Sequence, residues 1–445
     1  MKAFFSAASA GWLAALLLAP AAPAAAQAPA WQSARTVAAA TAAATTNSSE
    51  VRATAVDAAG NVYLAGSFEN SVALGGTTLT SVGDADVFVA KFSPASNQFV
   101  WAQRVGGTGQ DFAYALAVSG TGVYVAGGFR SSTADFGPTT LTNAGPGGSD
   151  DVFVAKLTDA GSSGSFAWAQ RAGGTDNDGA LALAVSGTSV YMAGYFFGPT
   201  ADFGSTNLTN AGVADVFVAK LTDAGPTGGF VWAQRAGGTG GDGAAALAVW
   251  GTAVFVAGGF ASPTADFGST NLTNAGAGYS DVFVAKLTDA GPTGSFAWAQ
   301  RAGGTGDDRA DALAVGGTGV YSVYAAGYVE SPTAGFGPIV LTNPTPGTPL
   351  GFLASLTDPT LTATTAAAGP REPAALFPNP ARHAATLRLP AGVAPAPLVL
   401  ADARGRVVRR YPAPAGGAAV LDLSGLPAGL YLLRGAGPAR RLAVE

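Results

Sequence analysis

One pattern of about 65 residues occurs five times in this chain and constrains the fold more than any other feature. Its leading tryptophans are separated by 70, 67, 64 and 66 residues, at Trp31, Trp101, Trp168, Trp232 and Trp298. Self-similarity at such a period is typical of arrays in which neighbouring units bury a shared core. The repeats therefore predict a fold built from successive copies of one small unit.

Each repeat contains four segments with the character of β-strands. In the second repeat they lie at residues 115–118, 123–127, 151–157 and 166–171. Apolar and polar residues alternate in them, and Gly, Asp, Asn and Pro separate them. Four strands per repeat are typical of a propeller blade. We predict an all-β chain in which residues 27–358 form a five-bladed β-propeller with four strands per blade. A string of β-sandwiches and a β-solenoid are the alternatives.

The two ends of the array predict how it closes. The fifth repeat has a third strand that ends near Leu356, and no fourth strand follows it. The first repeat begins with a spare strand at Trp31. Pairing this strand with the fifth repeat would remove the exposed edges of an open array.

The repeated blocks resemble the bacterial SBBP family, which is named for its β-propeller repeat. The blocks are Trp-Ala-Gln-Arg-Ala-Gly-Gly-Thr from Trp168, Val-Tyr-Met-Ala-Gly from Val190, and Asp-Val-Phe-Val-Ala-Lys from Asp215. They recur in the same order over about residues 31–357. The resemblance implies the propeller fold and little about activity.

Residues 1–26 have the features of a secretory signal peptide. Lys2 provides the positive charge, residues 4–18 form an apolar core, and residues 24–26 are three alanines suited to cleavage. The apolar run is shorter than a membrane-spanning helix needs and is followed by Pro20. We expect a secreted or cell-surface protein without a transmembrane segment.

The C-terminal segment differs from the repeats in charge and pattern. After a predicted linker at residues 359–373, six short strands are expected in residues 374–445, which suggests a small Ig-like β-sandwich. From residue 371 onward there are ten Arg and four acidic residues, whereas the chain as a whole has a net charge of −5.

This segment resembles the C-terminal sorting domain of type IX secretion in Bacteroidetes. The motifs are Phe-Pro-Asn-Pro from Phe377, the Asp-Ala-Arg-Gly-Arg hairpin from Asp402, and Leu-Asp-Leu-Ser-Gly-Leu-Pro-Ala-Gly-Leu-Tyr from Leu421. The resemblance implies passage through the outer membrane by the type IX machinery, which would recognise residues 374–445. Release or attachment to surface lipopolysaccharide would follow.

Composition excludes several kinds of chemistry. The chain has no Cys and one His, which excludes disulfides, Cys-ligated zinc and sites built from several histidines. The negative net charge offers no electrostatic footprint for nucleic acid. Any reaction would depend on carboxylates, hydroxyls, Arg, Lys or Tyr.

Two sets of loops carry repeated aspartates and should lie on one face of antiparallel blades. Candidate metal ligands are the aspartates that end the Gly-Gly-Thr loops, namely Asp111, Asp178, Asp242 and Asp308. Asp135, Asp202 and Asp266 lie in the second set of loops. A ring of carboxylates would suit calcium, the one cofactor considered. Alternatively, each Asp accepts hydrogen bonds from its own turn.

Residues that differ between repeats are the better ligand candidates, because a residue shared by all repeats serves the repeat itself. On the same face these are Tyr114, Asp176, Asn177, Phe196, Phe197, Tyr279, Asp307, Arg309 and Asp311. Aromatic rings beside carboxylates suit carbohydrate. We predict a binding or adhesion module for an extracellular polysaccharide or a surface protein, and not an enzyme. A polysaccharide-active hydrolase and a structural surface-layer protein are the alternatives.

Overall fold

The computed structural model describes residues 34–39, 48–145, 148–316, 322–358, 375–377, 380–388, 397–402, 406–413, 418–435 and 437–445. Every regular element in these residues is a β-strand, and the strands form small antiparallel sheets. The predicted all-β class is therefore confirmed. The predicted signal peptide, Trp31 and the linker at 359–373 lie outside the described residues.

The repeats form successive sheets with one common strand order. The first sheet is β2 (Ser49–Val56), β3 (Val62–Phe68), β6 (Asp86–Ser93) and β7 (Gln98–Val105). The second is β8 (Asp111–Ser119), β9 (Gly122–Phe129), β12 (Asp151–Asp159) and β13 (Gly164–Ala172). The third begins with β14 (Asp178–Ser186), β15 (Ser189–Phe197), β18 (Ala214–Asp223) and β19 (Gly228–Gly238). It has six strands, because β19 also pairs with β22 (Thr264–Phe267) and β22 with β23 (Thr270–Thr273). The fourth is β20 (Asp242–Trp250), β21 (Ala253–Phe260), β24 (Asp281–Asp289) and β25 (Gly294–Ala302).

The fifth sheet has three strands, in the order β26 (Asp308–Gly316), β27 (Ser322–Val329) and β30 (Leu350–Thr357). No fourth strand joins it within the described part of the chain. The strand predicted to close it, at Trp31, lies outside that part. The residues that follow Trp31 belong to the first repeat, because β1 (Ala38–Ala39) pairs with β4 (Ser71–Leu74).

A short hairpin lies between the second and third strands of each repeat, where the sequence predicted only a long loop. The hairpins are β4 with β5 (Thr77–Thr80), β10 (Thr133–Phe136) with β11 (Thr139–Thr142), β16 (Thr200–Phe203) with β17 (Thr206–Thr209), β22 (Thr264–Phe267) with β23 (Thr270–Thr273), and β28 (Thr333–Phe336) with β29 (Ile339–Thr342). The buried rings of Phe136, Phe203 and Phe267 anchor three of them.

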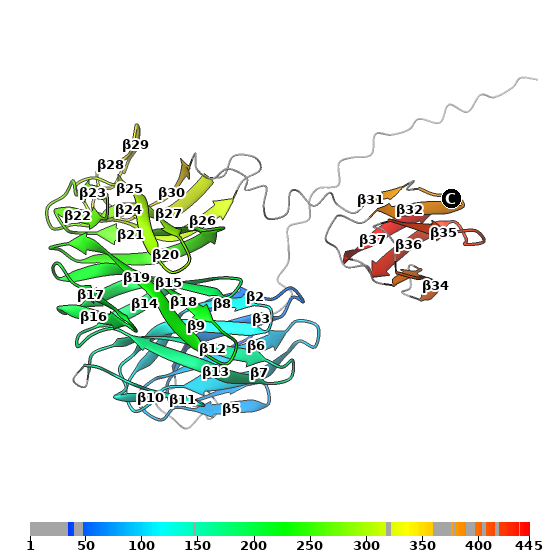
Figure 1. Cartoon of the computed structure of the whole chain (residues 1–445), viewed down its shortest axis with the longest axis horizontal. Coiled ribbons are helices and arrows are strands. Elements are labelled where there is room, and N and C mark those ends of the chain that lie inside the picture. Colours follow the sequence, from blue (N-terminus) through cyan, green and yellow to red (C-terminus); the bar gives the residue numbers. More distant parts are fainter. Residues whose placement is uncertain are drawn as a thin grey trace, which may run out of the picture. The chain divides into compact units, whose positions relative to one another are not determined.

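The core lies between successive sheets. One hydrophobic cluster combines Val87 and Trp101 of the first sheet with Val125, Phe129 and Phe153 of the second. Strands β9 and β21 are buried along their whole length, as expected for central strands covered on both faces. Figure 1 shows the first four sheets following one another in sequence order, from blue to green.

The chain divides into two compact units, Met1–Leu313 with Ala326–Phe352 and Ala314–Ala325 with Leu353–Glu445. The second unit contains two small sheets around buried leucines such as Leu400, Leu421 and Leu442. Their strands are β31 (Ala375–Phe377), β32 (Ala384–Arg388), β33 (Leu398–Ala401), β34 (Val407–Tyr411), β35 (Ala418–Asp422), β36 (Gly429–Gly435) and β37 (Gly437–Val444). Among the described residues, no helix has the length and apolar character needed to cross a membrane.

Candidate ligand-binding site

A β-bulge occurs at the same place in the first strand of at least four repeats. The register between the first and second strands shifts there, so one residue has no partner across the sheet. The bulged residues are Arg52, Tyr114, Leu181 and Ala245. The residues next to the bulge are nearly the same in these repeats, whereas the four bulged residues differ from one another. A bulge re-aims a side chain, so each repeat presents one variable residue at an equivalent position.

Three of these bulged residues, Arg52, Tyr114 and Leu181, line a cavity of about 660 Å³ in the first unit. The cavity is also lined by residues from the loops that join strands and from the ends of β14, β15, β20 and β26. Those that carry hydrogen-bonding or aromatic groups are Arg130, Asp150, Asn177, Tyr195, Phe197, Asp242, Ser280 and Arg309. All five repeats therefore contribute to one cavity.

The cavity wall combines aromatic rings with cations. The guanidinium carbon of Arg52 lies 5.3 Å from the ring centre of Tyr114, and Tyr114 stacks on Phe112 at 6.3 Å. Tyr195 and Phe197 meet edge to face at 5.7 Å. Burial raises the pKa of both tyrosines, so both hydroxyls are protonated at neutral pH. Neither hydroxyl has a hydrogen-bond partner among the described residues, which leaves both available to a ligand.

Ion pairs hold the charged groups of the wall. Arg130 binds Asp150 with two hydrogen bonds of 3.1 and 2.8 Å. Arg52 pairs with Glu50 at 2.7 Å, and Arg309 with Asp311 at 3.1 Å. The Asn177 side chain accepts a hydrogen bond from the backbone N–H of Asp150. Such braced polar groups keep their positions without a ligand, as pre-organised binding sites require.

The structure brings together several of the residues predicted to bind a ligand. Tyr114, Asn177, Phe197 and Arg309 line the cavity. Two more contact the wall: Asp311 pairs with Arg309, and Asp307 accepts a hydrogen bond from the backbone N–H of Ser280. Asp176 and Tyr279 are exposed and are not part of the wall.

Phe196 is a correction to the predicted ligand set. Its side chain is 0% exposed and belongs to the core cluster of the third repeat. Successive residues of a strand face opposite sides, so Phe197 lines the cavity while Phe196 packs inward. The Phe-Phe pair thus serves both the core and the cavity.

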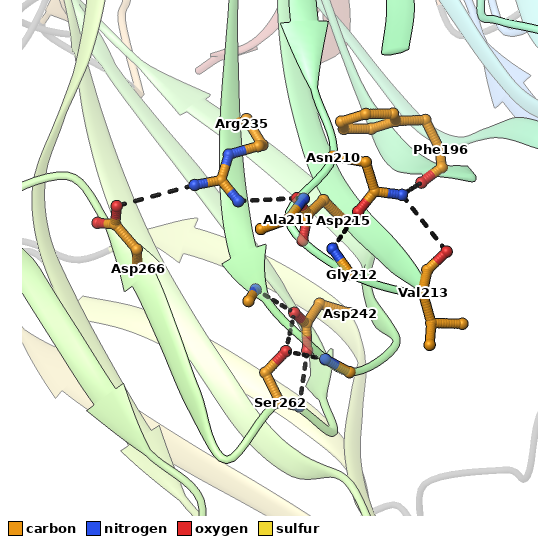
Figure 2. A network of polar contacts seen from close by, with 12 residues as sticks. Phe196, Asn210, Ala211, Gly212, Val213, Asp215, Arg235, Asp242, Ser262 and Asp266 are labelled. Atoms are coloured by element: carbon orange, nitrogen blue, oxygen red, sulfur yellow. Dashed lines mark hydrogen bonds and ion pairs between the residues drawn. The ribbon is translucent and has the colours of Figure 1, made fainter. Parts of the chain in front are cut away.

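The four aspartates considered as metal ligands are buried and hold their own turns. Asp242 accepts hydrogen bonds from the backbone N–H groups of Gly238 and Ser262 and from the Ser262 hydroxyl, as Figure 2 shows. Asp111 and Asp308 make the same contacts with Ser131 and Ser331. This is the alternative stated from the sequence, in which each Asp satisfies its loop. The described residues contain no cluster of three or more His, Asp or Glu placed to hold a metal ion.

The predicted meeting of the two sets of loops is confirmed by backbone pairing. Gly106 bridges Asp135, and Gly173 bridges Asp202. Side chains extend this link: in Figure 2, Arg235 spans from Asp215 at 2.7 Å to Asp266 at 3.8 Å. One face of the repeats therefore carries both loop sets.

A second repeated aspartate faces the first in four of the repeats and lies at the start of the third strand. These residues are Asp86, Asp151, Asp215 and Asp281. Each has a buried Oδ1 without a hydrogen-bond partner among the described residues, although its Oδ2 is paired with an arginine. At Gly237, a Cβ would lie 2.2 Å from Asp215 Oδ1 and 2.7 Å from Asp242 Oδ2. The two carboxyl groups therefore lie close together around Gly237, where a side chain would clash with both of them.

Burial and this close approach alter the acidity of the pair. Burial raises the pKa of Asp178 to about 7, and the charge of Asp151 adds to the increase. Burial likewise raises the pKa of Asp111 to about 6. A proton held by one carboxyl relieves the repulsion between two buried charges.

The repeated tryptophans join each sheet to the next. Tyr124, Lys156 and Trp168 form a row across three strands of the second sheet. All three donate to the Asp223 carboxylate of the third sheet, at 2.7, 2.6 and 3.0 Å. The same contacts join Tyr63, Lys91 and Trp101 to Asp159, and Tyr191, Lys220 and Trp232 to Asp289. These contacts agree with the expectation that a residue shared by the repeats serves the repeat itself.

Sequence reasoning missed five polar or aromatic residues of the wall, namely Arg52, Arg130, Asp150, Tyr195 and Ser280. For two of these residues, the sequence does show that the position varies between repeats. Arg52 occupies the position of Tyr114 in the degenerate first repeat, and Tyr195 stands where the second and fourth repeats have glycine.

Comparisons with known proteins leave the family open. No family model matches the chain, and no curated protein matches it. Among solved structures, a protein from Lactobacillus plantarum is similar with a TM-score of 0.23 and 11% identity. The match covers 80% of this chain and 99% of that one.

Proposed function

We propose that this protein is an exported binding module that holds an extracellular polysaccharide in the cavity of its repeat unit. The observation that carries the proposal is the convergence of repeat-variable residues on one cavity. Residues that all repeats share hold the sheets together, whereas Arg52, Tyr114, Tyr195 and Arg309 have no such duty. Half-buried tyrosines with unpartnered hydroxyls, next to braced Arg, Asp and Asn groups, suit a ligand with flat faces and many hydroxyls.

The architecture we propose for the repeats is a five-bladed β-propeller. Successive sheets with one strand order, and a cavity to which every repeat contributes, support it. The resemblance of the repeated blocks to SBBP repeats supports it as well.

Residues 374–445 are proposed as an Ig-like domain that directs export by the type IX machinery. The support is the resemblance of the motifs at Phe377, Asp402 and Leu421, together with the signal peptide expected at residues 1–26. In a bacterium with that machinery, deletion of residues 374–445 should leave the protein in the periplasm. Secretion of the truncated protein to the medium would contradict this part of the proposal.

A depletion assay with the full-length protein tests the binding function. The protein is incubated with insoluble and gelled polysaccharides, and both the protein lost from the supernatant and new reducing ends are measured. We expect depletion without sugar release, and a weaker depletion for Tyr114→Ala. New reducing ends would instead indicate a hydrolase. No depletion across the panel would refute polysaccharide binding and favour a surface protein as the partner or a structural role.

A further inference from the structure

Three arginines from different repeats line the cavity, in a part of the chain that is otherwise acidic. Residues 1–370 contain 13 Lys or Arg and 24 Asp or Glu. The cavity wall reverses this balance, with Arg52, Arg130 and Arg309 against Asp150 and Asp242. Asp242 is 2% exposed and is occupied by its own turn. The wall itself therefore carries three arginines and, besides the buried Asp242, one carboxylate, Asp150, while Glu50 and Asp311 pair with two of the arginines from outside the wall.

The three arginines differ in how many of their hydrogen-bond donors are already used within the protein. Arg130 donates to Asp150 from Nε and Nη2 and to the Gln110 side chain from Nη1. Arg52 is bound to Glu50 and lies over Tyr114. Arg309 Nε lies 3.1 Å from Asp311 Oδ1 but is buried without a hydrogen bond, and neither Nη donates a hydrogen bond to the described residues. Its side chain is 41% exposed, so these nitrogens keep their donors for a ligand.

The Arg309 side chain packs beside small residues of the fourth repeat. Gly259 and Ser280 lie beside its side chain, since a Cβ at Gly259 would be 3.7 Å from Arg309 Cγ and 3.4 Å from Ser280 Cβ. The equivalent glycine of the second repeat, Gly128, lies beside Tyr114 in the same way. Each of these glycines thus lies within contact range of one large cavity residue.

We propose that the cavity selects a saccharide that carries a carboxylate, such as a uronic acid residue. The Nη pair of Arg309 would bind the two carboxylate oxygens in parallel, because the planar guanidinium matches that geometry. The rings of Tyr114 and Tyr195 would contact the sugar itself. This inference rests on the proposed polysaccharide binding and assigns its chemical class.

A matched pair of polymers tests the inference. The full-length protein is run through native gels that contain sodium polygalacturonate or its methyl ester, which has the same backbone without the charge. We expect the acidic polymer to retard the protein with an affinity about tenfold higher, as one charge-assisted contact would give. Arg309→Gln should reduce binding of the acidic polymer to the level of the ester.

Two further variants distinguish recognition by the Arg309 guanidinium from unspecific attraction between charges. Arg309→Lys keeps the positive charge but lacks the planar guanidinium, so it should recover only part of the affinity for the acidic polymer. Arg382→Gln removes an exposed arginine of the C-terminal unit and should change nothing. An equal loss in Arg382→Gln would show unspecific attraction and overturn the inference. Equal binding of both polymers would also overturn it and leave the proposed function standing. Failure to bind these polymers or any neutral polysaccharide would refute the proposed function itself.

Discussion

At the scale of single residues, two groups of aspartates in the repeats show opposite shifts in pKa. Asp159, Asp223 and Asp289 accept Lys, Tyr and Trp donors between sheets. Burial alone would raise the pKa of Asp223, but the hydrogen bonds from Lys156, Tyr124 and Trp168 outweigh it and lower the pKa. Asp111 and Asp178, which face a second carboxyl, have raised pKa values instead.

Replacement of Asp223 tests the contact between sheets. Asp223→Asn leaves the buried Lys156 ammonium without its counter-ion, so the free energy of unfolding should fall by about 3 kcal/mol or more. The measurement is a urea titration followed by tryptophan fluorescence. Asp202→Asn is the control, because Asp202 is exposed and 3.6 Å from its arginine, and it should cost at most about 0.5 kcal/mol. Equal losses in the two variants would contradict this account.

The paired carboxyls predict an unusual dependence of stability on pH. The pKa of Asp178 is about 7 in the folded chain against 3.8 for the ordinary group, so the folded state holds a proton that the unfolded state releases. The stability that this proton provides is complete below pH 3.8 and is lost as the pH rises through 7.

The urea midpoint should therefore be higher at pH 5 than at pH 8, and Asp178→Asn should reduce the difference. Asp84→Asn, at an exposed position, serves as the control. A difference that is the same in Asp178→Asn and in the unaltered protein would show that Asp178 is not its source.

At the scale of elements, the bulged first strand connects the fold with the cavity. The bulge turns one carbonyl of each first strand toward a glycine of the second strand. At Gly194, a Cβ would lie only 1.8 Å from the carbonyl oxygen of Gly179. The glycine is thus required by the bulge, and the bulge presents Leu181 to the cavity.

Gly194→Ala should therefore disturb both stability and binding. Relief of the clash requires a backbone shift that we expect to cost about 3 kcal/mol and to weaken polysaccharide binding. Gly229→Ala is the matched control, since a Cβ there meets nothing within 4 Å. If the Gly194 variant unfolds at the same urea concentration as the control, the bulge is not held as described.

The strands were predictable from the sequence because their signals are local. Alternation and turn residues located the segments at 123–127 and 151–157, and the structure extends them to β9 and β12. The bulge was not predictable, because an extra residue in a strand changes its pairing and not its composition. The hairpin β10-β11 was taken for a loop because each of its strands has only four residues.

The candidate site was predictable only in part. Comparison of repeats found Tyr114, Asn177, Phe197 and Arg309, because variation between copies shows in the sequence. It misplaced Phe196, since adjacent positions face opposite sides and the register was unknown. It missed Arg130, whose place in the wall depends on the packing of loops from different repeats.

At the scale of the whole molecule, the residues that the repeats share and the residues that vary between repeats have separate roles. The shared Tyr, Lys, Trp and Asp residues join sheet to sheet, so the array is stable whichever residues stand at the variable positions. The variable positions meet in one cavity and can determine the ligand. We propose that the polysaccharide binds in this cavity.

Hydrogen exchange of the full-length protein tests where the polysaccharide binds. The ligand is an oligosaccharide of the polymer that depletes the protein, and exchange is compared with and without it. The account predicts slower exchange in residues 112–115, 177–181 and 195–197, and no change in residues 418–435. Slower exchange confined to the C-terminal unit, or unchanged exchange in the three cavity segments, would contradict it.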